Sequence, residues 1–137
     1  MIVRVFVGAA LTWFVVSASQ AGDWTNSGGN AGRNGLSSER GPGQADLLWS
    51  GGRPSIIGWQ PVTEGGRVFL VRQAFFAPGG APEDSPIVAM DLDTGAELWV
   101  VHLPYEPGNY ITWIAGVHGG RVFASRSGPC NAAKLYA

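Results

Sequence analysis

The segment Val88–Trp99, VAMDLDTGAELW, carries acidic residues and a glycine at spacings that could do chemistry. Asp91, Asp93 and Gly95 could begin a calcium loop, since such loops place oxygen ligands at alternating positions around a glycine turn. Asp93-Thr94-Gly95 could instead present a catalytic carboxylate. The third interpretation is structural, with two strands joined by a turn.

The two chemical interpretations each lack required residues. Counting from Asp91, the sixth loop position is Ala96 and the twelfth is His102, where a calcium loop requires glycine and a bidentate glutamate. Leu92–Ala96 resembles the active-site triplet of retroviral-type aspartic proteases, but these need two carboxylates sharing one proton, and the chain has no second triplet. Their Ile-Ile-Gly segment follows the triplet, whereas Ile56-Ile57-Gly58 precedes it. We therefore predict no metal site and no catalytic residue here.

The structural interpretation accounts for more of the segment. Aspartate and glycine favour a turn, Thr94 can hydrogen-bond to nearby backbone, and Gly95 can supply a positive φ angle. Ala89 is small enough for a neighbouring sheet to approach closely. Trp99 offers a large apolar ring whose indole N–H needs a partner.

The elements that would position this segment recur along the chain. Gly-Gly-Arg-Val-Phe occurs at 65–69 and again at 119–123, an offset of 54 residues. Leu48-Trp49 and Leu98-Trp99 are 50 residues apart, and Val88-Ala89 and Tyr136-Ala137 are 48 apart. Four strand-like segments in a unit of about 45 to 50 residues are typical of a β-propeller blade. We predict an all-β fold, a partial β-propeller of antiparallel four-stranded blades, with about one to two blades present.

Composition and local patterns agree with this class. The chain has 21 glycines, 9 prolines, 6 tryptophans and only 14% charged residues, which favours short strands and tight turns over helices. Val68–Val71 hardly alternates, which indicates a strand covered on both faces. The strands expected in the first unit lie near 57–62 and at 67–73, 86–91 and 97–103, and in the second unit they lie at 111–113, 121–126 and 134–137.

Residues that recur with the repeat are interpreted as structural. Arg67, Arg72, Arg121 and Arg126 are expected to cover blade edges or pair with acidic residues, and Trp59 and Trp113 to pack between blades. His102 and His118 have no nucleophile in a recognisable context, so we expect solvated side chains. The second unit breaks off before its turn, so we expect a fragment with exposed blade faces that self-associates.

The turn segment also carries a family resemblance. Ala89-x-Asp91-x-x-Thr94-Gly95-x-x-x-Trp99 resembles the tryptophan-docking motif of the pyrroloquinoline-quinone (PQQ) repeat, the blade signature of quinoprotein-type propellers. In that family the tryptophan of one blade stacks on the next, and the alanine and glycine leave room for it. Tyr136-Ala137 resembles the start of a second copy, and Leu47-Leu48-Trp49 resembles the tail of an earlier one. Asp23-Trp24 with Gly32–Gly35 resembles the opening segment of these proteins.

The resemblance implies two alternatives for function, and fold alone does not choose between them. PQQ-dependent dehydrogenases hold their quinone with an adjacent cysteine pair, a stacked tryptophan and a calcium ion, whereas this chain has one cysteine, Cys130. We expect a non-catalytic binding or scaffolding module, similar to the outer-membrane assembly factor of the BamB type, with a protein or small-ligand partner bound through the complete propeller. The alternative is the N-terminal part of a periplasmic PQQ-dependent dehydrogenase, and PQQ and calcium are cofactors only in that case.

The N-terminus has the layout of an export signal. Arg4 is followed by the apolar run Val5–Val16, and Ser19-Gln20-Ala21 offers small residues for cleavage. We predict a signal peptide over 1–21, a Gly/Ser/Asn-rich lead-in over 22–46 and propeller repeats over 47–137, in a periplasmic or secreted protein. The run is too short to span a bilayer comfortably and no second one follows, so no membrane span is expected.

Charge and cysteine content restrict the partners. The formal net charge is −1, and nothing in it points to nucleic acid or an anionic membrane. Cys130 is the only cysteine, so we expect a buried, inert thiol without an internal disulfide.

Overall fold

The chain is all-β, as its sequence predicts. The structure is a computed structural model that describes residues 22–40, 43–44, 46–51, 56–57, 60–73, 85–109, 111–127 and 134–137. Within these ranges the regular elements are strands: β1 (Ile56–Ile57), β2 (Val62–Glu64), β3 (Arg67–Gln73), β4 (Ile87–Asp91), β5 (Glu97–Val101), β6 (Ile111–His118), β7 (Arg121–Ser127) and β8 (Leu135–Tyr136). The predicted signal peptide, Trp59 and Cys130 lie outside the described residues.

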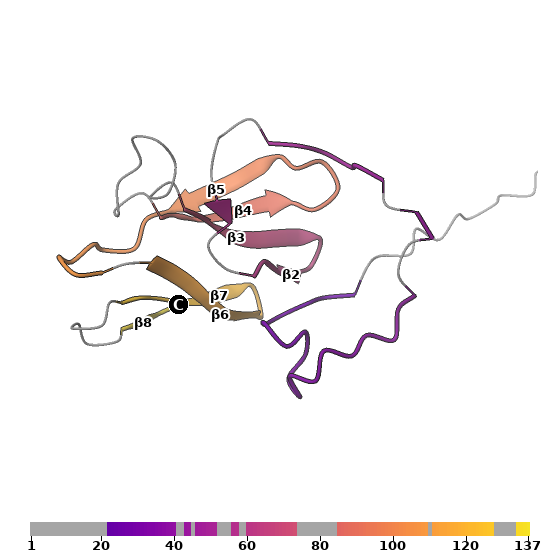
Figure 1. Ribbon diagram of the computed structural model, residues 1–137, viewed down its shortest axis with the longest axis horizontal. Coiled ribbons are helices and arrows are strands. Elements are labelled where there is room, and N and C mark those ends of the chain that lie inside the picture. The colour runs from indigo at the N-terminus through magenta and orange to yellow at the C-terminus, as the bar shows by residue number, and fades with distance from the viewer. Residues whose placement is uncertain are drawn as a thin grey trace, which may run out of the picture.

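The strands form two antiparallel sheets, stacked one above the other (Figure 1). Sheet 1 has the order β1-β3-β4-β5, with β2 also paired to β3. Phe69 of β3 lies opposite Val62 of β2 and opposite Ala89 of β4, while β1 pairs with the far end of β3. The single strand expected near 57–62 is therefore two short strands, β1 and β2. Both pair with the same side of β3, so sheet 1 is four strands wide. Sheet 2 has the order β6-β7-β8.

A Gly-Gly turn closes one hairpin in each sheet, β2–β3 in sheet 1 and β6–β7 in sheet 2. Gly65 and Gly66 have φ angles of 59° and 74°, and Gly119 and Gly120 have φ angles of 59° and 77°. Two-residue hairpin turns with positive φ at both central residues match the twist of the flanking strands, and glycine adopts that region without steric cost. This requirement explains why Gly-Gly is repeated before Arg-Val-Phe.

The main core lies between the two sheets. Alternate side chains of β3 and β4 face sheet 2 and are buried against it. This core comprises Val62, Phe69, Val71, Ile87, Ala89, Leu103, Ile114, Val117 and Ala124, with Val122 and Tyr136 packed at its border.

A second cluster covers the opposite face of sheet 1. Val68, Leu70, Val88 and Met90 are buried there, and Trp49, Leu92 and Val100 pack against them. The central strand β3 is thus covered on both faces, which confirms the expectation from its weak alternation.

The lead-in segment joins the two sheets, although its composition predicts only loop or linker. The carbonyl of Trp24 accepts a hydrogen bond from the Thr63 amide, and the carbonyl of Thr25 accepts one from the Val117 amide, both at 2.8 Å. Trp24 N also donates to Thr63 Oγ1 at 2.8 Å. The lead-in therefore bridges β2 of sheet 1 and β6 of sheet 2.

Carboxylates make further links to the Gly-Gly turns. Glu64 accepts from the amides of Gly119 and Gly120 at 3.0 and 2.8 Å, and Asp23 accepts from the amide of Gly65 at 2.9 Å. Each turn thus presents backbone amides to an acid from an earlier segment. In the described part of the chain, the structure contains no helix long and apolar enough to cross a membrane.

Candidate functional site

The Asp91–Ala96 connection is a turn built around one carboxylate. Asp91 Oδ1 accepts hydrogen bonds from Thr94 Oγ1 at 2.7 Å, Thr94 N at 2.8 Å and Asp93 N at 3.2 Å. Gly95 has a φ angle of 70°, and its amide donates to the Asp91 carbonyl at 2.9 Å. The glycine is needed here because other residues adopt this region at a steric cost.

These bonds favour the ionised form of Asp91. The Thr94 side-chain hydroxyl, followed by the Thr94 and Asp93 amides, lowers the pKa of the Asp91 carboxyl below its usual value. A carboxylate held ionised by three local donors is suited to shaping the backbone, since a general acid or base must exchange its proton near the operating pH. Across the described ranges, no three His, Cys, Asp or Glu residues gather in a group that could hold a metal ion.

Trp49 docks on this turn from outside sheet 1. Its indole Nε1 donates to the Leu92 carbonyl at 2.9 Å. A Cβ atom added to Gly95 would lie only 2.5 Å from Cδ2 of the indole, so a side chain there would displace the ring. Trp49 also packs against the Val68, Leu70, Val88 and Met90 cluster. We term this arrangement of Trp49, Leu92, Gly95 and the cluster the Trp49 site.

Trp99 lies on the other face of sheet 1. It stands opposite Ala89 in the β4–β5 pair, and its ring centroid is 5.8 Å from that of Phe69 at an interplanar angle of 41°. Trp99 borders a cavity of ≈ 300 Å³ that Val122, Ala124 and Tyr136 of sheet 2 also line. We term Trp99 with these three residues the Trp99 site.

The two sites occupy equivalent places on the two sheets. The 54-residue offset relates Val68 to Val122 and Leu70 to Ala124, and the 48-residue offset relates Val88 to Tyr136. Trp99 therefore meets sheet 2 at the positions equivalent to those where Trp49 meets sheet 1. The Trp99 site has no counterpart of the Asp91–Gly95 turn among the described residues, and Trp99 remains 37% exposed.

The five residues of the motif thus divide between the two sites. Asp91, Thr94 and Gly95 build the turn that receives Trp49, while Ala89 and Trp99 face sheet 2. Trp49 is the partner that the motif itself does not contain. The sequence signal that finds it is the repeated Leu-Trp pair.

The recurring arginines serve packing in two ways. Arg72 forms an ion pair with Glu97 at 2.8 Å, in line with the expected pairing with an acidic residue. Arg126 differs from the expectation because it is buried, with its guanidinium 4.9 Å from the Tyr105 ring centroid and Nη1 donating to the Leu103 carbonyl at 3.2 Å. A cation–π contact and a carbonyl acceptor allow the charge to remain inside.

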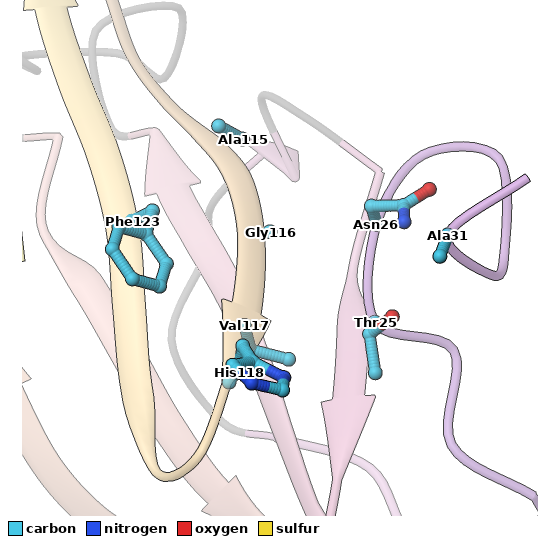
Figure 2. A pocket seen from close by; sticks show the side chains of 8 residues that line it. All are labelled: Thr25, Asn26, Ala31, Ala115, Gly116, Val117, His118 and Phe123. Atoms are coloured by element: carbon cyan, nitrogen blue, oxygen red, sulfur yellow. The ribbon is translucent and has the colours of Figure 1, made fainter. Parts of the chain in front are cut away.

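A second cavity, of ≈ 350 Å³, lies between the lead-in and sheet 2 (Figure 2). Thr25 and Asn26 line one side, and Phe123 and His118 line the other. A Cβ atom on Gly116 would come within 2.9 Å of the Thr25 carbonyl, so glycine permits the close approach of the lead-in. His118 is the last residue of β6 and is exposed, as expected for a solvated side chain. Among the described residues that line this cavity, no group of charged side chains gathers.

Fold and site together define a class, an all-β protein of stacked blade-like sheets in which tryptophans dock between neighbouring segments. No protein-family model, no curated protein sequence and no solved structure matches the chain.

Proposed function

We propose that this chain is an exported segment of a PQQ-repeat β-propeller with a non-catalytic binding or scaffolding role. The observation that supports the proposal is the contact of Trp49 with Gly95 and the Leu92 carbonyl. A tryptophan of one unit stacked on the Asp-x-x-Thr-Gly turn of the next is what the PQQ-repeat resemblance implies.

The use of the polar side chains favours a structural role over catalysis. Asp91 is engaged by its own turn, Glu64 by two backbone amides, and Arg72 by Glu97. Side chains whose polar atoms are hydrogen-bonded to nearby backbone or ion-paired stabilise the local geometry. This use favours a structural role for them over proton or group transfer.

Two observations favour a role without PQQ and calcium. The chain has one cysteine, so it cannot form an adjacent cysteine pair, and the described residues contain no cluster suited to a metal ion. We therefore assign no step to either group.

Activity in the presence of the cofactors tests the non-catalytic role. The full chain, purified after export, is incubated with PQQ and calcium, and reduction of a redox dye is measured with alcohols and sugars as substrates. We expect no reduction above a cofactor-only control. Substrate-dependent reduction would contradict the proposal and favour the dehydrogenase alternative.

Export is tested with a phosphatase reporter that is active only outside the cytoplasm. Residues 1–21 fused to the reporter should give activity. The matched variant Leu11→Lys, which interrupts the apolar run with a charge, should abolish it. Equal activity from both fusions would contradict export through this segment.

A further inference from the structure

The lead-in contains a compact loop that backbone hydrogen bonds close. The Gly35 amide donates to the Gly28 carbonyl at 2.9 Å and so joins the two sides of the loop. The loop directly follows Thr25, whose carbonyl binds the Val117 amide of sheet 2. Compact surface loops of this kind often carry functional residues.

Three asparagines lie at intervals of four residues in this loop, and their side chains are held differently. Asn26 Nδ2 donates to the Asn30 carbonyl at 2.9 Å. Asn30 Nδ2 donates to Asn34 Oδ1 at 2.8 Å and to the Leu36 carbonyl at 3.1 Å. Within the described residues Asn34 Nδ2 donates to no acceptor, and Asn34 is exposed whereas the other two are partly buried. Of the three amide nitrogens, that of Asn34 can therefore leave without breaking a hydrogen bond.

Two donors polarise the side-chain carbonyl of Asn34. Its Oδ1 accepts from the Leu36 amide at 3.0 Å and from Asn30 Nδ2 at 2.8 Å. Donors aimed at a carbonyl oxygen stabilise the oxyanion that forms when a nucleophile adds to the carbon. Asn34 Cγ is thereby activated toward addition.

The residue after Asn34 supplies an accessible nucleophile, its backbone nitrogen. Gly35 has a φ angle of 68°, and among the described residues no atom beyond its chain neighbours lies within 4 Å of its Cβ position. Without a Cβ atom, its amide nitrogen can approach the preceding side chain freely. Asn26 and Asn30 are followed by serine and alanine, whose Cβ atoms crowd the amide.

We propose that Asn34 is a self-modification site, where it cyclises with Gly35 to a succinimide that hydrolyses to aspartate and isoaspartate. Hydroxide takes the Gly35 amide proton, and the nitrogen adds to Asn34 Cγ while the carbonyl π pair moves onto Oδ1. The oxyanion collapses and the Cγ–Nδ2 bond breaks, with its electron pair going to Nδ2, which takes a proton from water and leaves as ammonia. One water then opens the ring, at Cγ to give aspartate or at the backbone carbonyl carbon to give isoaspartate.

The closed loop slows this reaction. While the Gly35 amide donates to the Gly28 carbonyl, its proton is shielded from hydroxide. Asn26 helps to keep the loop closed, because its Oδ1 accepts from the Gly28 amide at 2.8 Å. Exposed segments open locally at low free-energy cost, so cyclisation proceeds slowly in the folded chain.

The products alter the loop. Both carry a carboxylate in place of a neutral amide, and isoaspartate also routes the main chain through Cγ, which lengthens it between residues 34 and 35. The Gly28–Gly35 pair then loses its native spacing. Because the loop is continuous with Thr25, we expect the modification to weaken the contact between the lead-in and sheet 2.

Peptide mapping by mass spectrometry tests the site. The full chain is incubated in mildly alkaline buffer, and an unincubated sample serves as the blank. We expect Asn34 to lose the mass of ammonia and then to gain the mass of water, while Asn26 and Asn30 stay unchanged in the same sample. An unchanged Asn34, or equal conversion of Asn26 or Asn30, would overturn the proposal.

Two variants test the chemistry and the effect of the closed loop. Asn34→Gln keeps the amide but requires a ring larger by one atom, so it should show no conversion over the same time. Asn26→Ala releases Gly28 and should speed the conversion of Asn34 about fivefold, the change that the loss of one hydrogen bond produces.

Conversion of Asn34→Gln at the wild-type rate, or of Asn26→Ala no faster than the wild type, would also overturn the proposal. The inference uses only the lead-in loop and does not depend on the export or cofactor experiments. Its failure is therefore distinguishable from theirs.

Discussion

Trp49 and Trp99 are equivalent in the repeat, yet they are held differently. Trp49 has an acceptor for its indole N–H, a glycine that leaves room for its ring, and an apolar cluster beneath it. Trp99 packs against the Phe69 ring and the apolar surface of sheet 2, has no such turn among the described residues, and remains partly exposed. A complete docking site therefore needs both a sheet face and a turn, and the turn supplies the directional contacts.

The largest effect is expected from Gly95→Ala, which breaks the Trp49 site. The left-handed backbone costs about 1 to 2 kcal/mol for a residue with a Cβ atom, and the same atom would overlap the Trp49 ring. Together these should lower the free energy of unfolding by about 3 to 4 kcal/mol. Urea denaturation followed by circular dichroism measures the loss.

Gly43→Ala provides the control for this change. No described atom lies within 4 Å of the Cβ position of Gly43, so its substitution should change stability by less than about 0.5 kcal/mol. Similar losses from the two substitutions would contradict the role given to Gly95.

The next largest effect is expected from Trp49→Ala, with a loss of about 3 kcal/mol, because a large ring leaves the cluster on sheet 1. Trp49→Phe keeps most of the apolar area and removes only the hydrogen bond to Leu92, so it should cost about 1 kcal/mol. A loss from Trp49→Phe equal to that from Trp49→Ala would mean that the hydrogen bond, and not the ring, holds the site.

Trp99→Ala should cost less than Trp49→Ala, about 1 to 2 kcal/mol, because the ring is partly exposed and lacks the turn contacts. Denaturation of both variants under the same conditions compares the two sites directly. If Trp99→Ala were the more destabilising, the distinction between a complete and an incomplete site would be wrong.

The smallest effect at neutral pH is expected from Asp91→Asn, which keeps an acceptor oxygen at the turn. The pKa of Asp91 is lowered in the folded chain, so ionised Asp91 stabilises the fold above the ordinary aspartate pKa of about 3.9. That contribution is lost as pH falls through the folded pKa. Thermal unfolding between pH 2 and pH 6 should show a weaker acid-induced decrease for Asp91→Asn than for the wild type, and identical profiles would contradict this.

The sequence predicts the regular elements well because their signals are local. The Gly-Gly turns, the buried Val68–Val71 run and the strand after the Asp91 turn are all found where they are expected. The repeat offsets also identify Trp49 and Trp99 as equivalent positions.

Contacts between distant segments are not predictable in the same way. The bond between the Thr25 carbonyl and the Val117 amide joins a Gly/Ser/Asn-rich stretch to a strand more than ninety residues later. Backbone groups carry no residue-specific signal for such a bond. The burial of Arg126 is also not predictable from the sequence, because its carbonyl acceptor and the Tyr105 ring belong to an irregular segment.

The bidentate contact of Glu64 with the Gly119-Gly120 turn bears on the mechanics of the stack. Two sheets held by apolar side chains alone can slide and rotate over one another, because the hydrophobic effect has no direction. The hydrogen bonds of Glu64 hold the two sheets together at one point, and those of Trp24 and Thr25 hold them together at a second. Hydrogen bonds at two separate places restrict rotation as well as translation of one sheet over the other. The angle between the two sheets is therefore set by these residues of the chain.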